Sequence, residues 1–189
     1  MELRTALESL SPITSQRMLD TLPALQNIEL YADPDGNITG AMATDRYVLA
    51  RYGVQGEPAA YVSPVQAKQL LAQLKANPYS TIPPILDREA GTILGIPVTM
   101  PDDMAAQFPS AATKILDEAL AKDETQLPLG TGISLSIMEL VVKILKPLNR
   151  SKSSRNRSTL GLRLAARGSA IVTTVDELTL LVMPLRPHD

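Results

Sequence analysis

Two short segments decide how this chain is interpreted: Ala43-Thr44-Asp45-Arg46-Tyr47-Val48-Leu49-Ala50 and Leu181-Val182-Met183-Pro184-Leu185-Arg186. Each can be read simply as a strand end with a few buried apolar side chains. The second, however, places an apolar Met-Pro-Leu run close to the end of the sequence, where exposed flexible residues are expected. We therefore expect it to pack against another part of the molecule or to bind a partner.

A strong hairpin turn signal precedes the first segment. Asp33-Pro34-Asp35-Gly36-Asn37 separates two extended stretches, 27–32 and 38–42. The acidic residues of this turn imitate the start of a calcium loop. Such a loop needs Gly at its sixth position and Glu at its twelfth, where this chain has Ile38 and Thr44. A hairpin turn is therefore favoured over a calcium site.

Three amphipathic helices are predicted, each followed by extended segments. The first covers 3–11. The second has Ser63 as N-cap and Pro64 at the first helical position, and ends at Asn77-Pro78. The third begins with a capping-box pair, Ser136 and Glu139, and is expected to end at Pro147.

The extended segments give the chain a weak internal repeat. They are predicted at 27–32, 38–42 and 46–52 after the first helix, at 81–86 and 92–100 after the second, and at 159–164, 169–174 and 177–183 after the third. The pattern indicates an α+β fold of three repeated helix-plus-strands units, with a helical or irregular connector at 111–126.

The composition is that of a soluble globular protein, with 189 residues, 44% hydrophobic residues and a formal net charge of −2. No apolar run reaches the roughly 20 residues that cross a bilayer, so we expect a cytoplasmic protein that does not contact membranes. The chain has no cysteine, which excludes disulfides and thiolate metal sites.

Catalytic chemistry finds little support in the sequence. The single histidine, His188, is one residue from the end of the sequence, where a general base would be poorly held. Without a cysteine or a second histidine, nucleophilic triads and histidine-based metal sites are not expected. We therefore predict a protein that is not an enzyme and that needs no cofactor or metal.

Positive charge is concentrated in one part of the chain. Residues 141–175 contain no Asp or Glu but include Lys143, Lys146, Arg150, Lys152, Arg155, Arg157, Arg163 and Arg167. The segment can bind an anionic partner on one face, or it can simply be a solvated loop. Both readings stay open.

At this point the sequence resembles a known family, the β sliding clamp of bacterial DNA polymerase III. That family typically carries an Ala-Thr-Asp-Gly-x-Arg-Leu-Ala-like segment and ends in Val-Met-Pro-x-Arg. Here Ala43-Thr44-Asp45 with Leu49-Ala50, and Val182-Met183-Pro184-Leu185-Arg186, are similar. Thr21-Leu22-Pro23, Tyr61-Val62 and Phe108-Pro109-Ser110 follow in the family's order over nearly the whole chain.

The resemblance implies a DNA clamp-like fold, with helices on one face of antiparallel sheets and lining a ring around DNA. Residues 1–112 resemble the complete middle domain of the clamp, 113–126 form a connector, and 127–189 resemble the second half of the last domain. The family's ring contains twelve helix-plus-strands units, so four chains of three units would close one. A homo-oligomer is therefore expected.

The two motifs form the walls of one hydrophobic pocket in the family, which receives short peptides from polymerases and other replication proteins. Transferred by position, the peptide-binding residues are Thr44, Tyr47, Val48, Leu49, Leu181, Met183, Pro184, Leu185 and Arg186. Because Arg46, Tyr47 and Val48 replace the usual Gly-x-Arg, an altered peptide preference is expected.

Double-stranded DNA would be contacted through phosphates, without sequence readout. The residues implied are Lys68, Lys75, Lys143, Lys146, Arg150, Lys152, Arg155 and Arg157, although the same lysines could merely solvate helix faces. Two alternatives remain. One is a clamp mimic that never encircles DNA and sequesters clamp-binding partners. The other is a nucleic-acid-binding module centred on the basic loop.

Overall fold

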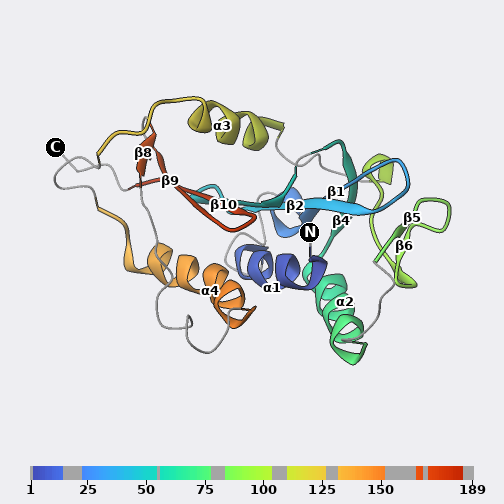
Figure 1. Ribbon diagram of the computed structural model, residues 1–189. Helices are drawn as coiled ribbons and strands as arrows, with labels where there is room; N and C mark the ends of the chain where they lie inside the picture. Colours follow the sequence, from blue (N-terminus) through green and yellow to red (C-terminus); the bar gives the residue numbers. More distant parts are fainter. Residues whose placement is uncertain are drawn as a thin grey trace.

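The computed structural model describes residues 2–14, 23–54, 56–77, 84–103, 110–126, 132–151, 165–167 and 170–184, and the structural statements below concern these parts of the chain. Within them the fold is mixed helix and antiparallel sheet (Figure 1), as the sequence predicts. The Asp33–Asn37 turn is confirmed, since Asp33 Oδ1 accepts a hydrogen bond from the Asn37 backbone N–H at 2.9 Å.

A seven-stranded antiparallel sheet forms the centre of the molecule, in the order β4-β1-β2-β3-β10-β9-β8. The strands are β1 (Ile28–Ala32), β2 (Ile38–Thr44), β3 (Val48–Gly53), β4 (Pro58–Val62), β8 (Ala165–Arg167), β9 (Ala170–Val175) and β10 (Leu178–Val182). The pairing of β3 with β10 joins segments on either side of the predicted connector 113–126. Strands of both predicted domains thus share one sheet, and the domain division itself stays a prediction.

Three helices cover one face of this sheet: α1 (Leu3–Thr14), α2 (Pro64–Ala76) and α4 (Leu135–Ser151). The middle helix, α1, contacts both α4 and α2 (Figure 1). Leu3, Leu7 and Leu10 recur at helical spacing and are buried against the sheet. The main hydrophobic core therefore lies between these helices and the sheet, and is called the helix-side core below.

A fourth helix, α3 (Ser110–Leu120), lies on the opposite face of the sheet (Figure 1). It overlaps the segment 111–126, for which the sequence left helical and irregular structure open. The remaining elements are two short 3₁₀ turns, η1 (Pro23–Gln26) and η2 (Pro101–Asp103), and a small sheet of β5 (Leu86–Asp87), β6 (Thr92–Ile93) and β7 (Ile96–Pro97). The long strand predicted at 92–100 is wrong, because a turn with Leu94 and Gly95 at positive φ folds it back on itself.

Helix ends were predicted unequally well. The Ser63 cap of α2 is confirmed, and Gln66 completes the capping box. In α4, however, Ser134 Oγ accepts the Ile137 N–H at 3.3 Å, so Ser134 takes the capping role that the sequence suggested for Ser136. The helix also continues through Pro147 to Ser151. Leu148, directly after the proline, is buried in the helix-side core, and we attribute the continuation to that packing.

Candidate functional site

The two segments singled out in the sequence lie side by side at the end of β3 and β10. Val48 pairs with Val182 and Leu49 pairs with Leu181. Beyond the last pair, the Met183 backbone N–H donates to the Tyr47 carbonyl oxygen at 2.8 Å. The β3–β10 junction therefore brings together residues that the resemblance assigns to the two walls of one pocket.

A tight turn connects β2 to β3 at this junction. The Asp45 carboxylate accepts the N–H groups of Tyr47 at 3.0 Å and Val48 at 2.8 Å. The Thr44 hydroxyl donates to the Val48 carbonyl oxygen at 2.9 Å. Between them Arg46 has a φ of 80°, a left-handed conformation that favours glycine. The side chains of Thr44 and Asp45 thus hold a turn that its central residue disfavours.

Because side chains alternate along a strand, the predicted peptide-binding residues are divided between the two faces of the sheet. Leu49 and Leu181 are buried on the face that carries α3, and Met183 is half-buried beside them. Pro184 is half-buried, and Tyr47 is 53% exposed. Val48 points the other way and is fully buried in the helix-side core. Its inclusion in the binding surface was therefore wrong. Leu185 and Arg186 lie outside the described residues.

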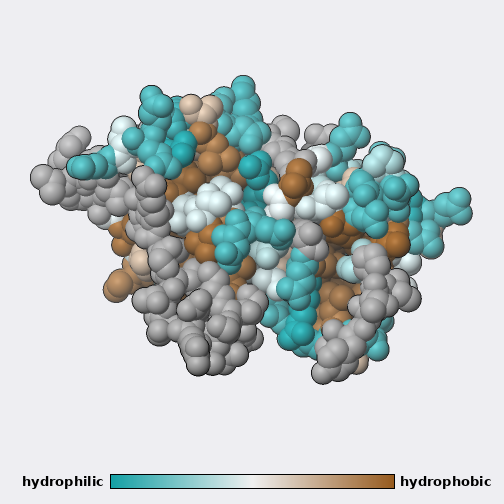
Figure 2. Space-filling view, viewed as in Figure 1, coloured by the Kyte–Doolittle hydropathy of each residue, from teal (hydrophilic) through white to brown (hydrophobic). Residues whose placement is uncertain are grey.

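A second hydrophobic cluster, called the outer-face cluster, fills the space between the sheet and α3. Its buried members are Tyr31, Met42, Leu49, Tyr61, Leu116, Ala119, Ala170, Val172 and Leu181, with Leu120 and Met183 packed at its border. Figure 2 shows hydrophilic residues on the outer side of α3 and apolar residues between it and the sheet. Part of the apolar surface of the β3–β10 junction, namely Leu49 and Leu181, is thus buried in one cluster with a helix of the same chain.

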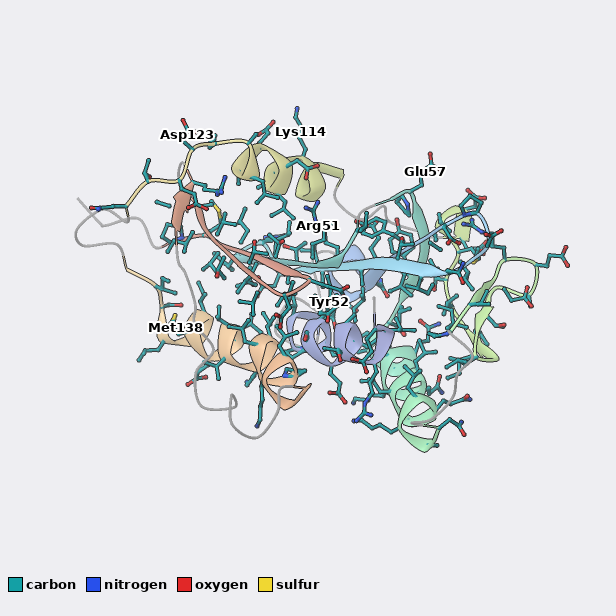
Figure 3. All side chains as sticks on the ribbon, viewed as in Figure 1. Arg51, Tyr52, Glu57, Lys114, Asp123 and Met138 are labelled. Carbon is teal, nitrogen blue, oxygen red and sulfur yellow. The ribbon has the colours of Figure 1, made fainter. Side chains whose placement is uncertain are left out.

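Polar contacts fix α3 to the sheet at two places. Arg51 of β3 points toward α3 (Figure 3), and its Nη1 lies 3.1 Å from Asp117 Oδ1. At the C-terminal end, Arg167 Nη1 donates to the carbonyl oxygens of Leu120 at 2.6 Å and Lys122 at 2.7 Å. Its Nη2 donates to Glu124 Oε1 at 2.7 Å. Arg167 therefore binds carbonyl groups that the end of a helix leaves unpaired.

A carboxyl group is buried on the same face of the sheet. Glu29 receives hydrogen bonds from the Tyr31 hydroxyl at 2.7 Å and the Tyr61 hydroxyl at 3.1 Å. Burial raises the pKa of Glu29, although both hydroxyl groups oppose this. Burial and the neighbouring Glu29 raise the pKa of Tyr61 to about 12.

A basic groove opens on the opposite side of the molecule, among α1, α2 and α4. Its volume is about 520 Å³. Four of the predicted DNA-binding residues line it: Lys68, Lys75, Lys143 and Lys146. The structure thus brings together lysines from two helices that are far apart in the sequence. The backbone of Arg150 belongs to α4, its side chain is not described, and Lys152, Arg155 and Arg157 lie outside the described residues.

One acidic residue modifies the charge of this basic groove. Glu8 also lines it, and Lys75 Nζ lies 3.2 Å from Glu8 Oε1. Arg4 Nε shares the same carboxylate oxygen at 3.4 Å. Lys75 is therefore partly neutralised within the chain, which makes Lys68, Lys143 and Lys146 the stronger candidates for phosphate contacts.

The described residues contain no group of three or more His, Cys, Asp or Glu side chains that could hold a metal ion. None of the helices described is long and apolar enough to span a bilayer. His188 lies outside the described residues.

The fold is that of the DNA polymerase III sliding clamps. Similar solved structures include a β subunit from Thermotoga maritima (TM-score 0.56, 13% identity) and a putative β subunit from Eubacterium rectale (TM-score 0.59, 11% identity). A third is the sliding clamp of Bacillus subtilis (TM-score 0.54, 11% identity). They cover 99–100% of this chain, which spans only 63–64% of theirs. No protein-family model and no curated protein matches the chain.

Several residues of the site were not foreseen from the sequence. Arg51 binds Asp117, which lies 66 residues further along the chain. Arg167 binds the Leu120 carbonyl oxygen, 47 residues before it. No local sequence pattern predicts such distant pairs. Glu29 could have been found, because strand alternation places it with Tyr31 on one face of β1. A carboxyl group next to a tyrosine hydroxyl on one strand face is a signal worth testing.

Proposed function

We propose that the chain is a sliding-clamp-like replication accessory protein without enzymatic activity. It binds short peptide segments of polymerases and other replication factors at the β3–β10 junction. The observation that carries this proposal is the meeting of the two motif segments, joined by the hydrogen bond from Met183 N–H to the Tyr47 carbonyl oxygen. Apolar and flexible side chains such as those of Met183 and Leu49 suit peptide anchors.

Peptide binding is tested by fluorescence polarisation with a labelled peptide of the Gln-Leu-x-Leu-Phe type. Met183→Ala should weaken saturable binding by about tenfold, because it removes an apolar contact at the junction. Thr179→Ala is the matched control, since Thr179 lies on the same strand and face but farther from the turn. Equal binding by both variants would argue against this surface.

DNA contact through the basic groove is the second part of the proposal. Lysines from α2 and α4 converge there without a sequence-reading element, which suits contacts to phosphates. Closure of a ring from several chains would place these helices around the duplex. Light scattering that finds a monomer at high protein concentration would exclude such a ring, and would favour a clamp mimic that only sequesters partners.

A further inference from the structure

We infer that α3 is a built-in competitor for the peptide surface at the β3–β10 junction, and that a partner peptide must displace it. The inference rests on the proposed function, because it concerns access to the same surface. Leu49 and Leu181 belong to that surface, yet each is buried in the outer-face cluster together with Leu116 and Ala119 of α3. A peptide cannot reach these side chains while α3 stays in place.

The contact surface that the described side chains of α3 (114–120) make is small enough to be exchanged. Among them, Leu116 and Ala119 are buried in the outer-face cluster, and Leu120 packs at the border. Ile115 remains 48% exposed. A peptide with two or three apolar anchors offers the sheet a comparable apolar surface. Replacement of α3 by a partner therefore leaves the outer-face cluster covered.

The described contacts of α3 are concentrated at its C-terminal end. Arg167 binds two carbonyl oxygens at the C-terminal end and also Glu124. Thr125, just beyond the helix, forms a β-bridge with Ala166. Within the helix, Asp117 pairs with Arg51, and the Asp117 side chain is 55% exposed, so this ion pair contributes little. Among the described contacts of α3, those at the C-terminal end are therefore the firmest, and this end can stay anchored when the helix leaves the sheet.

The release experiment compares two variants of α3 in the same polarisation assay. Leu116→Ala weakens the packing of α3 without changing the sheet, so the peptide should bind roughly tenfold more tightly than to the unaltered chain. Ile115→Ala is the matched control, because this neighbouring side chain is half-exposed, and it should leave the affinity unchanged. Circular dichroism verifies that both variants remain folded.

A locking experiment tests the same point in the opposite direction. The chain has no cysteine, so Arg51→Cys with Asp117→Cys supplies one thiol pair that a short bifunctional maleimide can bridge. The bridged protein should lose peptide binding. The same variant before bridging is its control and should bind.

The outcomes separate this inference from the proposed function. If the peptide binds the unaltered chain and Leu116→Ala equally well, or binds the bridged protein, α3 does not compete and the inference is wrong, while peptide binding stands. Weaker binding by Leu116→Ala would instead make α3 part of the receptor. If no folded variant binds the peptide, the proposed function itself fails.

Discussion

Arg46 occupies a position where the family that this chain resembles has glycine. Its φ of 80° explains why glycine suits that position. A Cβ atom in the left-handed region crowds the following carbonyl group. The hydrogen bonds of Thr44 and Asp45 to the backbone of the turn hold this conformation despite that cost. Strained residues of this kind cluster at binding sites, and this one borders the proposed peptide surface.

Arg46→Gly should relieve the strain and raise the free energy of unfolding by up to about 1 kcal/mol, after allowance for the greater freedom of glycine in the unfolded chain. Urea titration measures the change. Arg46→Ala is the control, because it removes the guanidinium group but keeps a Cβ atom. If the alanine variant gains as much stability as the glycine variant, the strain is not the cause.

Glu29 makes folding sensitive to pH. Its pKa is raised above 4.5 mainly by burial, so the folded state holds the proton more tightly than the unfolded chain. Stability should therefore fall as pH rises from about 4.5 through the raised pKa, and level off above it. Glu29→Gln keeps the size of the side chain and cannot ionise.

The measurement is urea unfolding of the unaltered chain and of Glu29→Gln at several pH values between 4.5 and 8. The stability of the unaltered chain relative to the variant should decline across that range, because only the unaltered chain acquires a buried negative charge. Other carboxyl groups are common to both proteins and cancel in the difference. A constant difference would show that Glu29 keeps its ordinary pKa in the fold.

Among the elements, local signals predicted helix starts better than strand ends. Ser63 followed by Pro64 defines the start of α2, because capping and a fixed proline φ act within one turn. The strand β4 was missed, since its sequence Pro58–Val62 lacks polar alternation and is recognised only through pairing with β1. The continuation of α4 through Pro147 depends in the same way on packing that no local pattern contains.

In the candidate site, too, some features could be predicted from the sequence and others depend on packing. The family resemblance implied that the two motif segments would meet, and in the structure Met183 binds Tyr47 through the backbone. Their side-chain directions were not predicted, because a list of neighbours in sequence ignores strand alternation, and Val48 was misplaced for that reason. The cover by α3 could not be predicted from the connector, since it depends on Leu116 reaching a cluster built from six strands.

The anchor of α3 gives a prediction at the scale of an element. Arg167→Ala removes charge-assisted hydrogen bonds to the Leu120 and Lys122 carbonyl oxygens, and should cost about 1–3 kcal/mol of stability. Because these hydrogen bonds hold the C-terminal end of α3, their loss should accelerate amide hydrogen exchange in residues 110–120 more than in α1. Arg167→Lys, which cannot form the same fork, should recover only part of the loss. Equal acceleration in both helices would indicate global destabilisation instead.

At the scale of the whole molecule, the two faces of the sheet have different characters. One carries α1, α2 and α4 with the basic groove, and the other carries α3 over an apolar cluster. The proposed function, in which one surface contacts DNA and another binds a peptide, requires two such separate surfaces. The net charge of −2 makes it unlike proteins that coat nucleic acid through bulk charge, so DNA affinity should depend on few side chains.

That dependence can be measured as the slope of DNA affinity against salt. Lys143→Glu with Lys146→Glu should weaken binding to a duplex and reduce the slope by up to about 2. Each phosphate contact that is lost lowers by about one the number of counterions released when the protein binds. Lys114→Glu with Lys122→Glu changes the net charge equally, on and beside α3 on the opposite side of the sheet. If both pairs weaken binding alike, overall charge rather than the basic groove governs DNA contact. If only the α4 pair does, the groove between the helices is the surface that touches DNA.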